Sequence, residues 1–477
     1  YIPNLIDSML LNLEVSDSNF LLIKHYNTFD LTKEYVNEIA LANPKQRFLY
    51  HSFDAGSMLG AFEPFVEWIK QLFYELSDES LDSFFEESRV YALHRPIFKS
   101  FFETGVCKRK EEILVTEVEF EKRMFIEEII RMLHRLSKKR PLVLILNRLH
   151  GAGSSTIKLV TSLLANRHSK NIAVLATYNE IAPELKYVKD YWADLLKKFD
   201  EYDCIIDWTL STVPLATDNS VFKFSNNDLS EYFIKLNNMM NMLALTQATF
   251  YLDIMYHKFE VEKLYIIPKY KFIFLEMYAK IAMYQDKISD ALLYNNGMRL
   301  IMEVEDNLGW RFKYNYLAGQ IHMYGFQKES VNKYIQEAIK ISKHLNNPFL
   351  EYKAALLKHM AHFNGWRNIW LLDTDEYVED DIINKSKKYE YFNHLAHIYV
   401  YSFDNDYRKY SDVNGIEERL SDFSRGIEIA TRLGNDQFLI EAYKKNVMAA
   451  STNGFFDVAN YFYGKCYEIV TKNGDLF

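Results

Sequence analysis

The part of the sequence that comes nearest to known phosphate chemistry lies close to its start. Residues 20–24 are apolar and predict a buried strand, and residues 33–40 predict an amphipathic helix. Residues 25–32 between them stand where a phosphate-binding loop of the pattern G-x-x-x-x-G-K-[ST] would stand. Such a loop uses its glycines to bring backbone N–H groups close to phosphates, and its lysine to neutralise their charge.

Nearly all of these groups are replaced in this sequence. His25 and Asp30 take the two glycine positions, and Leu31 takes the lysine position. Thr32 alone fits the pattern. Asp30 would place a carboxylate where a phosphate should lie, and the non-glycine residues crowd the space that the backbone needs. We therefore expect no catalytic residue and no bound nucleotide in this loop.

A second stretch would have to supply the metal site of a nucleotide-hydrolysing domain. Residues 140–146 predict a buried strand, and residues 156–166 predict the helix that follows it. In such domains Mg²⁺ is held by a loop hydroxyl and by a carboxylate at the end of the central strand. Here Asn147 and Arg148 follow the strand, and they offer an amide and a positive charge instead. The sequence therefore predicts no magnesium site and no other cofactor.

These strands resemble the central and following strands of the STAND/AAA-type ATPase domains that precede helical repeats in bacterial signalling and transcription regulators. In that family the central strand ends in two aspartates, then Leu-His-Trp-Ala-Asp and a serine, and the next strand ends in Ala-Thr-Tyr-Arg. The positions that match the family are Leu149, His150, Ala152, Ser155, Ala176, Thr177 and Tyr178. The positions that depart from it are Asn147, Arg148, Gly151, Gly153 and Asn179. Residues 60–65 also resemble the family, and the resemblance spans roughly residues 15–210.

The resemblance implies a degenerate P-loop domain, a pseudo-ATPase in which frame residues survive while the charged catalytic ones are lost. Active members carry a helical lid and a winged helix between the ATPase core and the repeats. Here only about twenty residues separate the last predicted strand from the first repeat helix, so those parts are expected to be missing. The alternative is an ordinary α/β domain that matches the pattern by chance.

Bulk composition narrows the class of protein. The chain has 477 residues, enough for two or three domains, with 49% hydrophobic and 25% charged residues. Its net charge of −9 argues against direct nucleic-acid binding and against an anionic membrane surface. Cys107, Cys204 and Cys466 are far apart, which fits a reducing cytoplasm. The sequence opens at Tyr1 without methionine and shows neither a signal peptide nor an apolar run long enough for a membrane.

The pattern of elements predicts two domains. Strands are expected near residues 20–24, 47–53, 141–146, 171–177 and 204–210, with helices between them, and residues 64–135 read as mostly helical. Such alternation predicts an α/β parallel-sheet domain over residues 1–210. The polar stretch 211–227 contains Pro214 and is read as a linker. Residues 228–477 then show helical patterns only.

The helical part carries signs of a repeat. Turn signals recur at intervals of 40 residues, from Gly325 to Gly365 and from Gly434 to Gly474. Residues 308–325 and 328–345 resemble a long tetratricopeptide repeat (TPR), with residues 317–319 supplying small side chains at the close helix contact. We expect an all-α, TPR-like solenoid of stacked helix pairs. An irregular helical domain is the alternative.

Two further groups of polar residues are better explained without a metal. His359 with His362, and His394 with His397, each place two imidazoles on one helical face. Ala361 and Ala396 beside them point to helix contacts instead. The acidic run 373–381 lacks the glycine and the glutamate that a calcium loop requires, and we read it as a solvated helix start.

The expected function is non-catalytic regulation by protein–protein contact in a bacterial signalling or transcription system. A protein or peptide partner, or a small effector, would bind the concave face of the solenoid, and the α/β domain could support a homo-oligomer. Tyr314 and Tyr352 are the predicted partner-binding residues, because they combine large area with a polar group. The alternatives are an atypical nucleotide-binding switch, or the sensory part of a larger protein with a cyclase, kinase or DNA-binding output.

Overall fold

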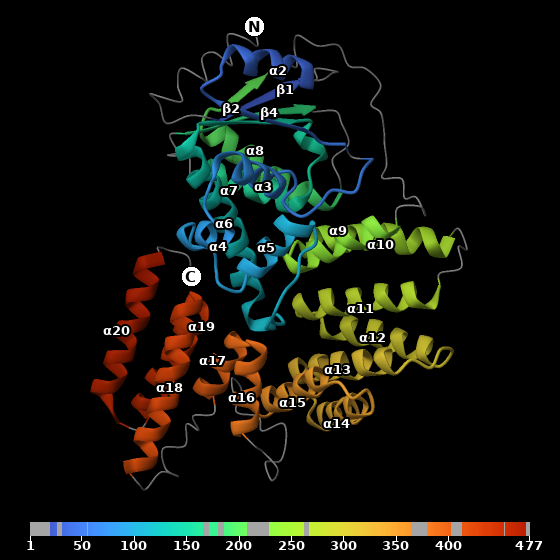
Figure 1. Ribbon diagram of the computed structural model, residues 1–477, viewed down its shortest axis with the longest axis vertical. Coiled ribbons are helices and arrows are strands. Elements are labelled where there is room, and N and C mark those ends of the chain that lie inside the picture. The colour runs from blue at the N-terminus through green and yellow to red at the C-terminus, as the bar shows by residue number, and fades with distance from the viewer. Residues whose placement is uncertain are drawn as a thin grey trace. The chain divides into compact units, whose positions relative to one another are not determined.

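The computed structural model describes ten stretches of the chain (Figure 1), which are residues 20–25, 31–54, 56–165, 171–179, 186–207, 229–261, 267–363, 379–401, 413–452 and 454–473. The chain forms two compact units. Unit 1 comprises Tyr1–Val90, His94–Lys108 and Glu121–Glu262. Unit 2 comprises Tyr91–Leu93, Arg109–Phe120 and Lys263–Phe477. No helix in the described stretches is both long enough and apolar enough to cross a membrane.

Unit 1 is built on a five-stranded sheet in which every pair of neighbouring strands is parallel. Its strands are β1 (Phe20–His25), β2 (Arg47–Ser52), β3 (Leu142–Asn147), β4 (Ile172–Asn179) and β5 (Ile205–Asp207). Their order is β2-β3-β4-β1-β5. All residues of β3 are buried, as expected of a parallel strand that is covered on both faces. The predicted strands are confirmed, although residues 208–210 lie outside the described part.

Nine helices of unit 1 are described, apart from short 3₁₀ turns. They are α2 (Lys33–Ala42), α3 (Phe65–Leu76), α4 (Leu81–Glu87), α5 (Arg95–Thr104), α6 (Val118–Lys139), α7 (Ser154–Ala165), α8 (Lys189–Glu201), α9 (Leu229–Asn241) and α10 (Leu245–Val261). The first residues of α6, 118–120, are counted with unit 2. Helix α2 covers one face of the sheet, where Val36 packs with alternate strand residues such as Ile23, Ile145 and Leu175.

The division between the units differs from the predicted boundary. The predicted linker, residues 211–227, lies outside the described part of the chain. Helices α9 and α10 lie side by side and belong to unit 1 rather than to the helical repeats (Figure 1). They are held there by hydrogen bonds, for example from the Asn238 side chain to the Gly105 carbonyl and from the Gln247 side chain to the Leu59 carbonyl.

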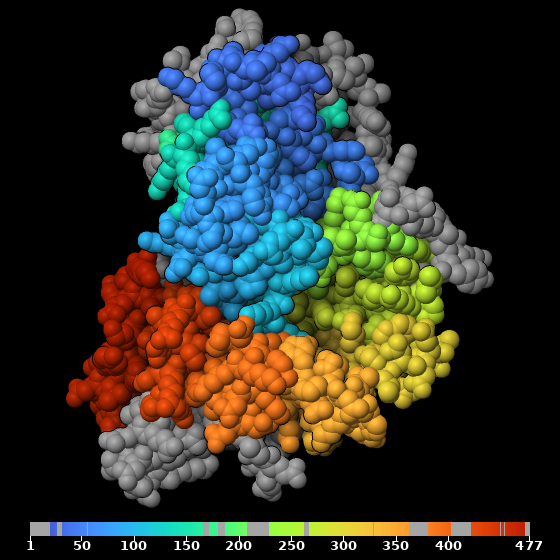
Figure 2. Space-filling view, viewed as in Figure 1, coloured from blue at the N-terminus to red at the C-terminus, as the bar shows by residue number. Residues whose placement is uncertain are grey.

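Unit 2 contains ten described helices that follow one another along the chain, each against the next (Figure 1). They are α11 (Pro268–Tyr284), α12 (Ile288–Met302), α13 (Leu308–Tyr324), α14 (Lys328–His344), α15 (Pro348–Phe363), α16 (Glu379–Tyr389), α17 (Phe392–Tyr401), α18 (Val413–Leu433), α19 (Asp436–Thr452) and α20 (Phe456–Asn473). On the face drawn in Figure 2, the side chains of the yellow, orange and red helices form a continuous surface.

The predicted helix pair at residues 308–325 and 328–345 is confirmed as α13 and α14. Gly319 is the close contact that the sequence indicated. A Cβ atom there would lie 3.1 Å from Leu357 and 3.2 Å from Ile335, so neighbouring helices approach α13 where it has no side chain. Gly434 ends α18 with φ of 81°, a left-handed conformation that glycine adopts without strain.

Candidate functional site

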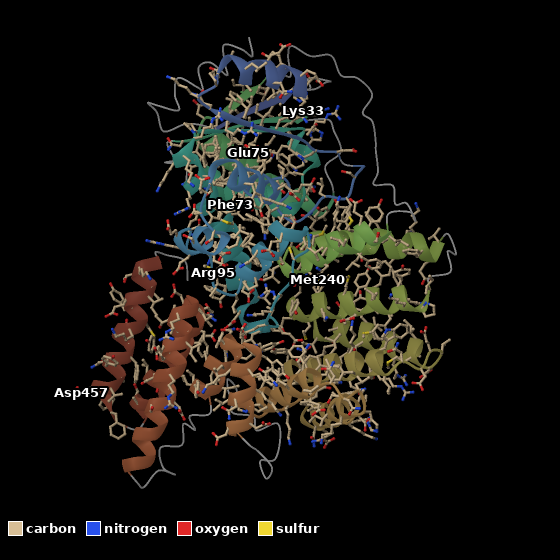
Figure 3. All side chains as sticks on the ribbon, viewed as in Figure 1. Lys33, Phe73, Glu75, Arg95, Met240 and Asp457 are labelled. Atoms are coloured by element: carbon tan, nitrogen blue, oxygen red, sulfur yellow. The ribbon has the colours of Figure 1, made fainter. Side chains whose placement is uncertain are left out.

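The first candidate site lies at the carboxyl ends of β1 and β3, where ligands bind in open α/β sheets. Leu31, at the lysine position of the loop, is buried and packs against Ile23, Val36 and Phe48. Its side chain therefore belongs to the hydrophobic core. Lys33, the nearest described lysine in the sequence, begins α2 and is exposed (Figure 3).

Thr32, the one residue that fits the phosphate-binding pattern, has a local structural role. It is the N-cap of α2, and its hydroxyl accepts a hydrogen bond from the Tyr35 amide at 3.3 Å. His25 ends β1 and is buried. Asp30 lies outside the described residues. After Asp30, the connection thus consists of Leu31, which belongs to the core, and Thr32, which caps α2.

Asn147, at the end of β3, is a buried hydrogen-bonding centre. Its Oδ1 accepts from the Leu31 amide at 3.3 Å and from the Thr177 hydroxyl at 2.8 Å. Its Nδ2 donates to the Ser52 hydroxyl at 3.0 Å and to the Tyr50 hydroxyl at 3.4 Å. One neutral side chain on β3 thus connects Leu31, the residue before the N-cap of α2, with β2 and β4. The oxygen and the nitrogen of this amide therefore both hydrogen-bond protein groups.

The neighbouring residues that match the family also make contacts within the fold. The Thr177 hydroxyl accepts from the Arg148 amide at 2.8 Å, and His150 Nδ1 accepts from the Asn179 amide at 3.3 Å. Arg148 has φ of 55° and an exposed side chain. Thr177 and His150 therefore hydrogen-bond backbone amides within unit 1.

Ser155 connects a third matching stretch to helix α10. Its hydroxyl accepts from the Phe62 amide at 2.9 Å and donates to Gln247 Oε1 at 2.9 Å. The Gln247 amide nitrogen donates in turn to the carbonyls of Leu59 and Gly60. Residues 60–65 are thus fixed against α7 and α10. Sequence reasoning missed Gln247, because nothing in a helical pattern distinguishes a buried glutamine from an exposed one.

We expect Asn147→Ala to destabilise unit 1 by about 2–4 kcal/mol, because the buried Leu31 amide, the buried Thr177 hydroxyl on β4 and two hydroxyls on β2 lose a hydrogen-bonding partner. Asn43→Ala is the matched control. Asn43 donates one side-chain hydrogen bond, to the Ile39 carbonyl, from a half-buried position, and its loss should cost about 1 kcal/mol. Urea unfolding of both variants measures the difference, and equal losses would contradict the assigned role of Asn147.

The two predicted partner-binding residues do not lie on a surface, and this prediction is corrected. Tyr314 is buried in the core formed by α11, α12 and α13. Tyr352 is fully buried, and its hydroxyl hydrogen-bonds the Ser386 hydroxyl at 3.0 Å. The helices of unit 2 pack aromatic side chains on more than one face, so the spacing alone did not show which of them face outward.

The second candidate site is formed where residues 109–120 cross the first helices of successive pairs in unit 2. Glu111 lies at the N-terminus of α17, where it is buried. It accepts hydrogen bonds from the backbone amides of Asn393 at 3.0 Å and His394 at 3.1 Å. The His394 Nδ1 atom donates to it at 2.9 Å. A helix N-terminus is a favourable place for a carboxylate, because its first amides have no partners within the helix.

Glu112, the next residue, reaches α13 and α15. It accepts from the Tyr316 hydroxyl at 2.6 Å and from the Gln320 amide nitrogen at 3.0 Å, and it pairs with the Lys353 ammonium. Burial pushes the pKa of Glu112 upward, but the Lys353 charge and the hydrogen bonds from Lys353 and Tyr316 outweigh it, so the pKa lies below its usual value. Glu112 is therefore charged at neutral pH.

Glu117 is buried against α17 and the start of α19. It accepts from the Asn393 side chain at 2.7 Å, from His397 Nε2 at 3.0 Å and from the Asn435 side chain at 2.8 Å. Asn435 also caps α19, since its Oδ1 accepts from the Phe438 amide at 3.0 Å. The three glutamates thus occupy three separate sets of donors, and α13, α15, α17 and α19 supply them.

The histidines of this site appeared in the sequence only as a weak metal pattern. His394 and His397 were predicted to flank a helix contact, and Ala396 is indeed buried. Their carboxylate partners, which the sequence did not reveal, come from residues 283 and 280 positions earlier. Within the described residues, no group of three or more histidine, cysteine or acidic side chains is arranged to hold a metal ion.

Comparisons with known proteins add little to this geometry. No protein-family model matches the chain, and no curated protein matches its sequence. Among solved structures, the chain is similar to a signal transduction ATPase with numerous domains (STAND) that has a tetratricopeptide repeat sensor, from Pyrococcus horikoshii. The match covers 97% of this chain and 94% of that chain, with 11% identity and a TM-score of 0.29. Similarity at this level does not extend that protein's properties to the present chain.

Proposed function

We propose that this chain is a non-catalytic regulatory or scaffold protein that acts through protein contacts, in bacterial signal transduction or transcription regulation in the cytoplasm. Unit 1 would be a pseudo-ATPase platform, and unit 2 a TPR-like binding module. The observation that carries the proposal is the state of the loop after β1. Leu31 is a core residue where a phosphate-binding lysine would stand, and its amide donates to Asn147, where a metal-binding carboxylate would stand.

The physical argument concerns charge. Phosphoryl transfer is catalysed mainly by positioning and by neutralising the charge of the phosphates, and both the lysine and the metal contribute to this. An isobutyl group and a hydrogen-bonded amide supply neither. The proposed binding role of unit 2 is supported by its own contacts, because its helices already hold an acidic segment, residues 109–120, through side-chain hydrogen bonds.

We expect no ATP hydrolysis above a buffer blank and no heat of binding when ATP and Mg²⁺ are titrated into the protein. Radiolabelled ATP turnover and isothermal calorimetry measure the two quantities. Thr32→Ala is the diagnostic variant, because Thr32 is the one loop residue that fits the phosphate-binding pattern. Turnover that Thr32→Ala abolishes would overturn the proposal. A nucleotide-dependent rise in melting temperature without turnover would instead favour an atypical nucleotide switch.

A further inference from the structure

We propose that unit 2 carries a binding site for an acidic peptide, and that residues 109–120 of this chain, a loop followed by a 3₁₀ turn and the start of α6, are a ligand already bound there. We call this site the acid-binding face. It consists of Tyr316, Gln320, Lys353, Asn393, His394, His397 and Asn435. The proposal rests on the proposed function, because it names the class of partner that the helical unit would bind.

The contacts of residues 109–120 have the form of peptide recognition. Residues 112–114 have no regular secondary structure, and Val115–Glu117 form one 3₁₀ turn before α6 begins. Each of the three glutamates accepts from three different donor groups. The donors lie on the first helices of four successive pairs, which is where repeat proteins present an extended binding surface. The Val115 amide also donates to the Tyr324 hydroxyl, at 3.4 Å.

The chemistry of the face selects carboxylates. It combines one ammonium, two imidazoles, three side-chain amides, one tyrosine hydroxyl and the first backbone amides of α17. All of these groups can donate hydrogen bonds. An apolar peptide in the same place would bury these donors without acceptors, at a cost of about 1–3 kcal/mol for each one. Water could serve them if the face were empty, so a carboxylate-bearing peptide is the ligand that can replace water without leaving donors unsatisfied.

The spacing of the segment describes the partner further. Glu111 and Glu112 are adjacent and point to different donors, and Glu117 follows six positions after Glu111. Ile113, Leu114 and Val118 between and after them are buried. Thr116 and Glu119 are exposed. The expected partner peptide therefore has two adjacent acidic residues, then two apolar residues, and a third acidic residue six positions after the first.

Residues 109–120 already occupy the acid-binding face, so the affinity that a partner peptide needs is set by competition with them. A covalently attached ligand acts at an effective concentration of the order of millimolar. A free peptide with the same contacts must therefore compete with residues 109–120, and it should bind much more tightly once their carboxylates are removed. The proposal can be tested on the full chain for this reason.

The test uses a fluorescent peptide with the sequence of residues 109–120, titrated into the full-length protein by fluorescence anisotropy. We expect it to bind the variant E111Q/E112Q/E117Q at least about tenfold more tightly than the wild type. Adding K353M to that variant should weaken binding by roughly tenfold, because the peptide then lacks the ammonium. A peptide in which the three matching glutamates are glutamine should bind at least about tenfold more weakly, whereas a peptide changed only at the position of Glu119 should bind within about twofold.

Circular dichroism first establishes that the triple variant is folded. If it is not, E112Q alone takes its place, since Glu112 is only half-buried, and the same peptide order is expected. A folded variant that does not bind the peptide would overturn the proposal, and so would equal binding of the glutamate and glutamine peptides. Neither result concerns ATP. If the peptide does not bind and the protein does not turn over ATP, the proposal of an acid-binding face is wrong, but the proposal that the chain is non-catalytic still stands.

Discussion

Replacing His94 by alanine is expected to lower the free energy of unfolding of unit 1 by about 3–5 kcal/mol, because two buried carboxylates lose the imidazole that lies between them. His94 Nδ1 lies 2.8 Å from Glu128 Oε2, and Nε2 lies 3.1 Å from Glu121 Oε2. All three side chains are at most 1% exposed. The imidazole also stacks on Phe125, with 3.7 Å between the ring centroids.

Hydrogen exchange of peptides from α5 and α6 measures this loss of stability locally. H94A/E121Q/E128Q is the control, because it removes the histidine together with both negative charges. It should be less destabilised than H94A, since the two carboxylate charges that His94 stabilises are removed together with it. If the single and triple variants lose equal stability, the cost comes from the cavity beside Phe125 and not from the carboxylates.

The same site should make stability depend on pH. Burial lowers the pKa of His94, but Glu128 and Glu121 outweigh it, so the pKa lies above its ordinary value of 6.5. A group whose pKa is raised by folding stabilises the native state fully below the pKa of the unfolded state, and the contribution is lost as pH rises through the native pKa. Urea unfolding of the wild type should therefore show a loss of stability above about pH 6.5. H94Q, which does not titrate, should show less of this loss.

Replacing Glu117 by alanine is expected to destabilise unit 2 by about 3–5 kcal/mol, for a related reason. Its carboxylate is 1% exposed and serves Asn393, His397 and Asn435 at once. Alanine would remove the acceptor that these three donors share, although Asn435 keeps a second acceptor, Asn393 Oδ1 at 2.9 Å. Hydrogen exchange should rise most in α17 and α19, because the lost contacts connect their first turns.

Glu119→Ala is the matched control, as Glu119 is exposed and only two positions away. A surface substitution of this kind should change stability by about 0.5 kcal/mol or less. The loss of stability in E117Q should lie between the losses in E117A and E119A, because the glutamine oxygen can still accept hydrogen bonds although the charge is lost. Equal effects of E117A and E119A would show that the buried contacts of Glu117 do not hold residues 109–120 in place.

The sequence by itself was sufficient to predict the parallel sheet and the helix pair of residues 308–325 and 328–345. The strands were visible because residues 142–147 and 172–178 are buried on both faces, which requires uninterrupted apolar runs. Helices α13 and α14 were visible because their turn residues and small contact residues are local signals. The loss of phosphate chemistry at Leu31 and Asn147 was likewise a matter of residue type, and the structure adds what these side chains do instead.

Only the tertiary structure decided where functional groups face and what they meet. Tyr314 and Tyr352 looked like binding residues because aromatic spacing on a helix does not reveal which neighbours cover it. The interval that read as mostly helical contains the non-helical residues 109–114, in which Glu112 finds a donor 204 positions later and Glu111 finds one 283 positions later. Such pairs arise from the way the helices stack, and no local pattern encodes them. A glutamate in a loop and a histidine on a helix look the same in sequence whether they meet or face water, because burial is a property of the assembled fold.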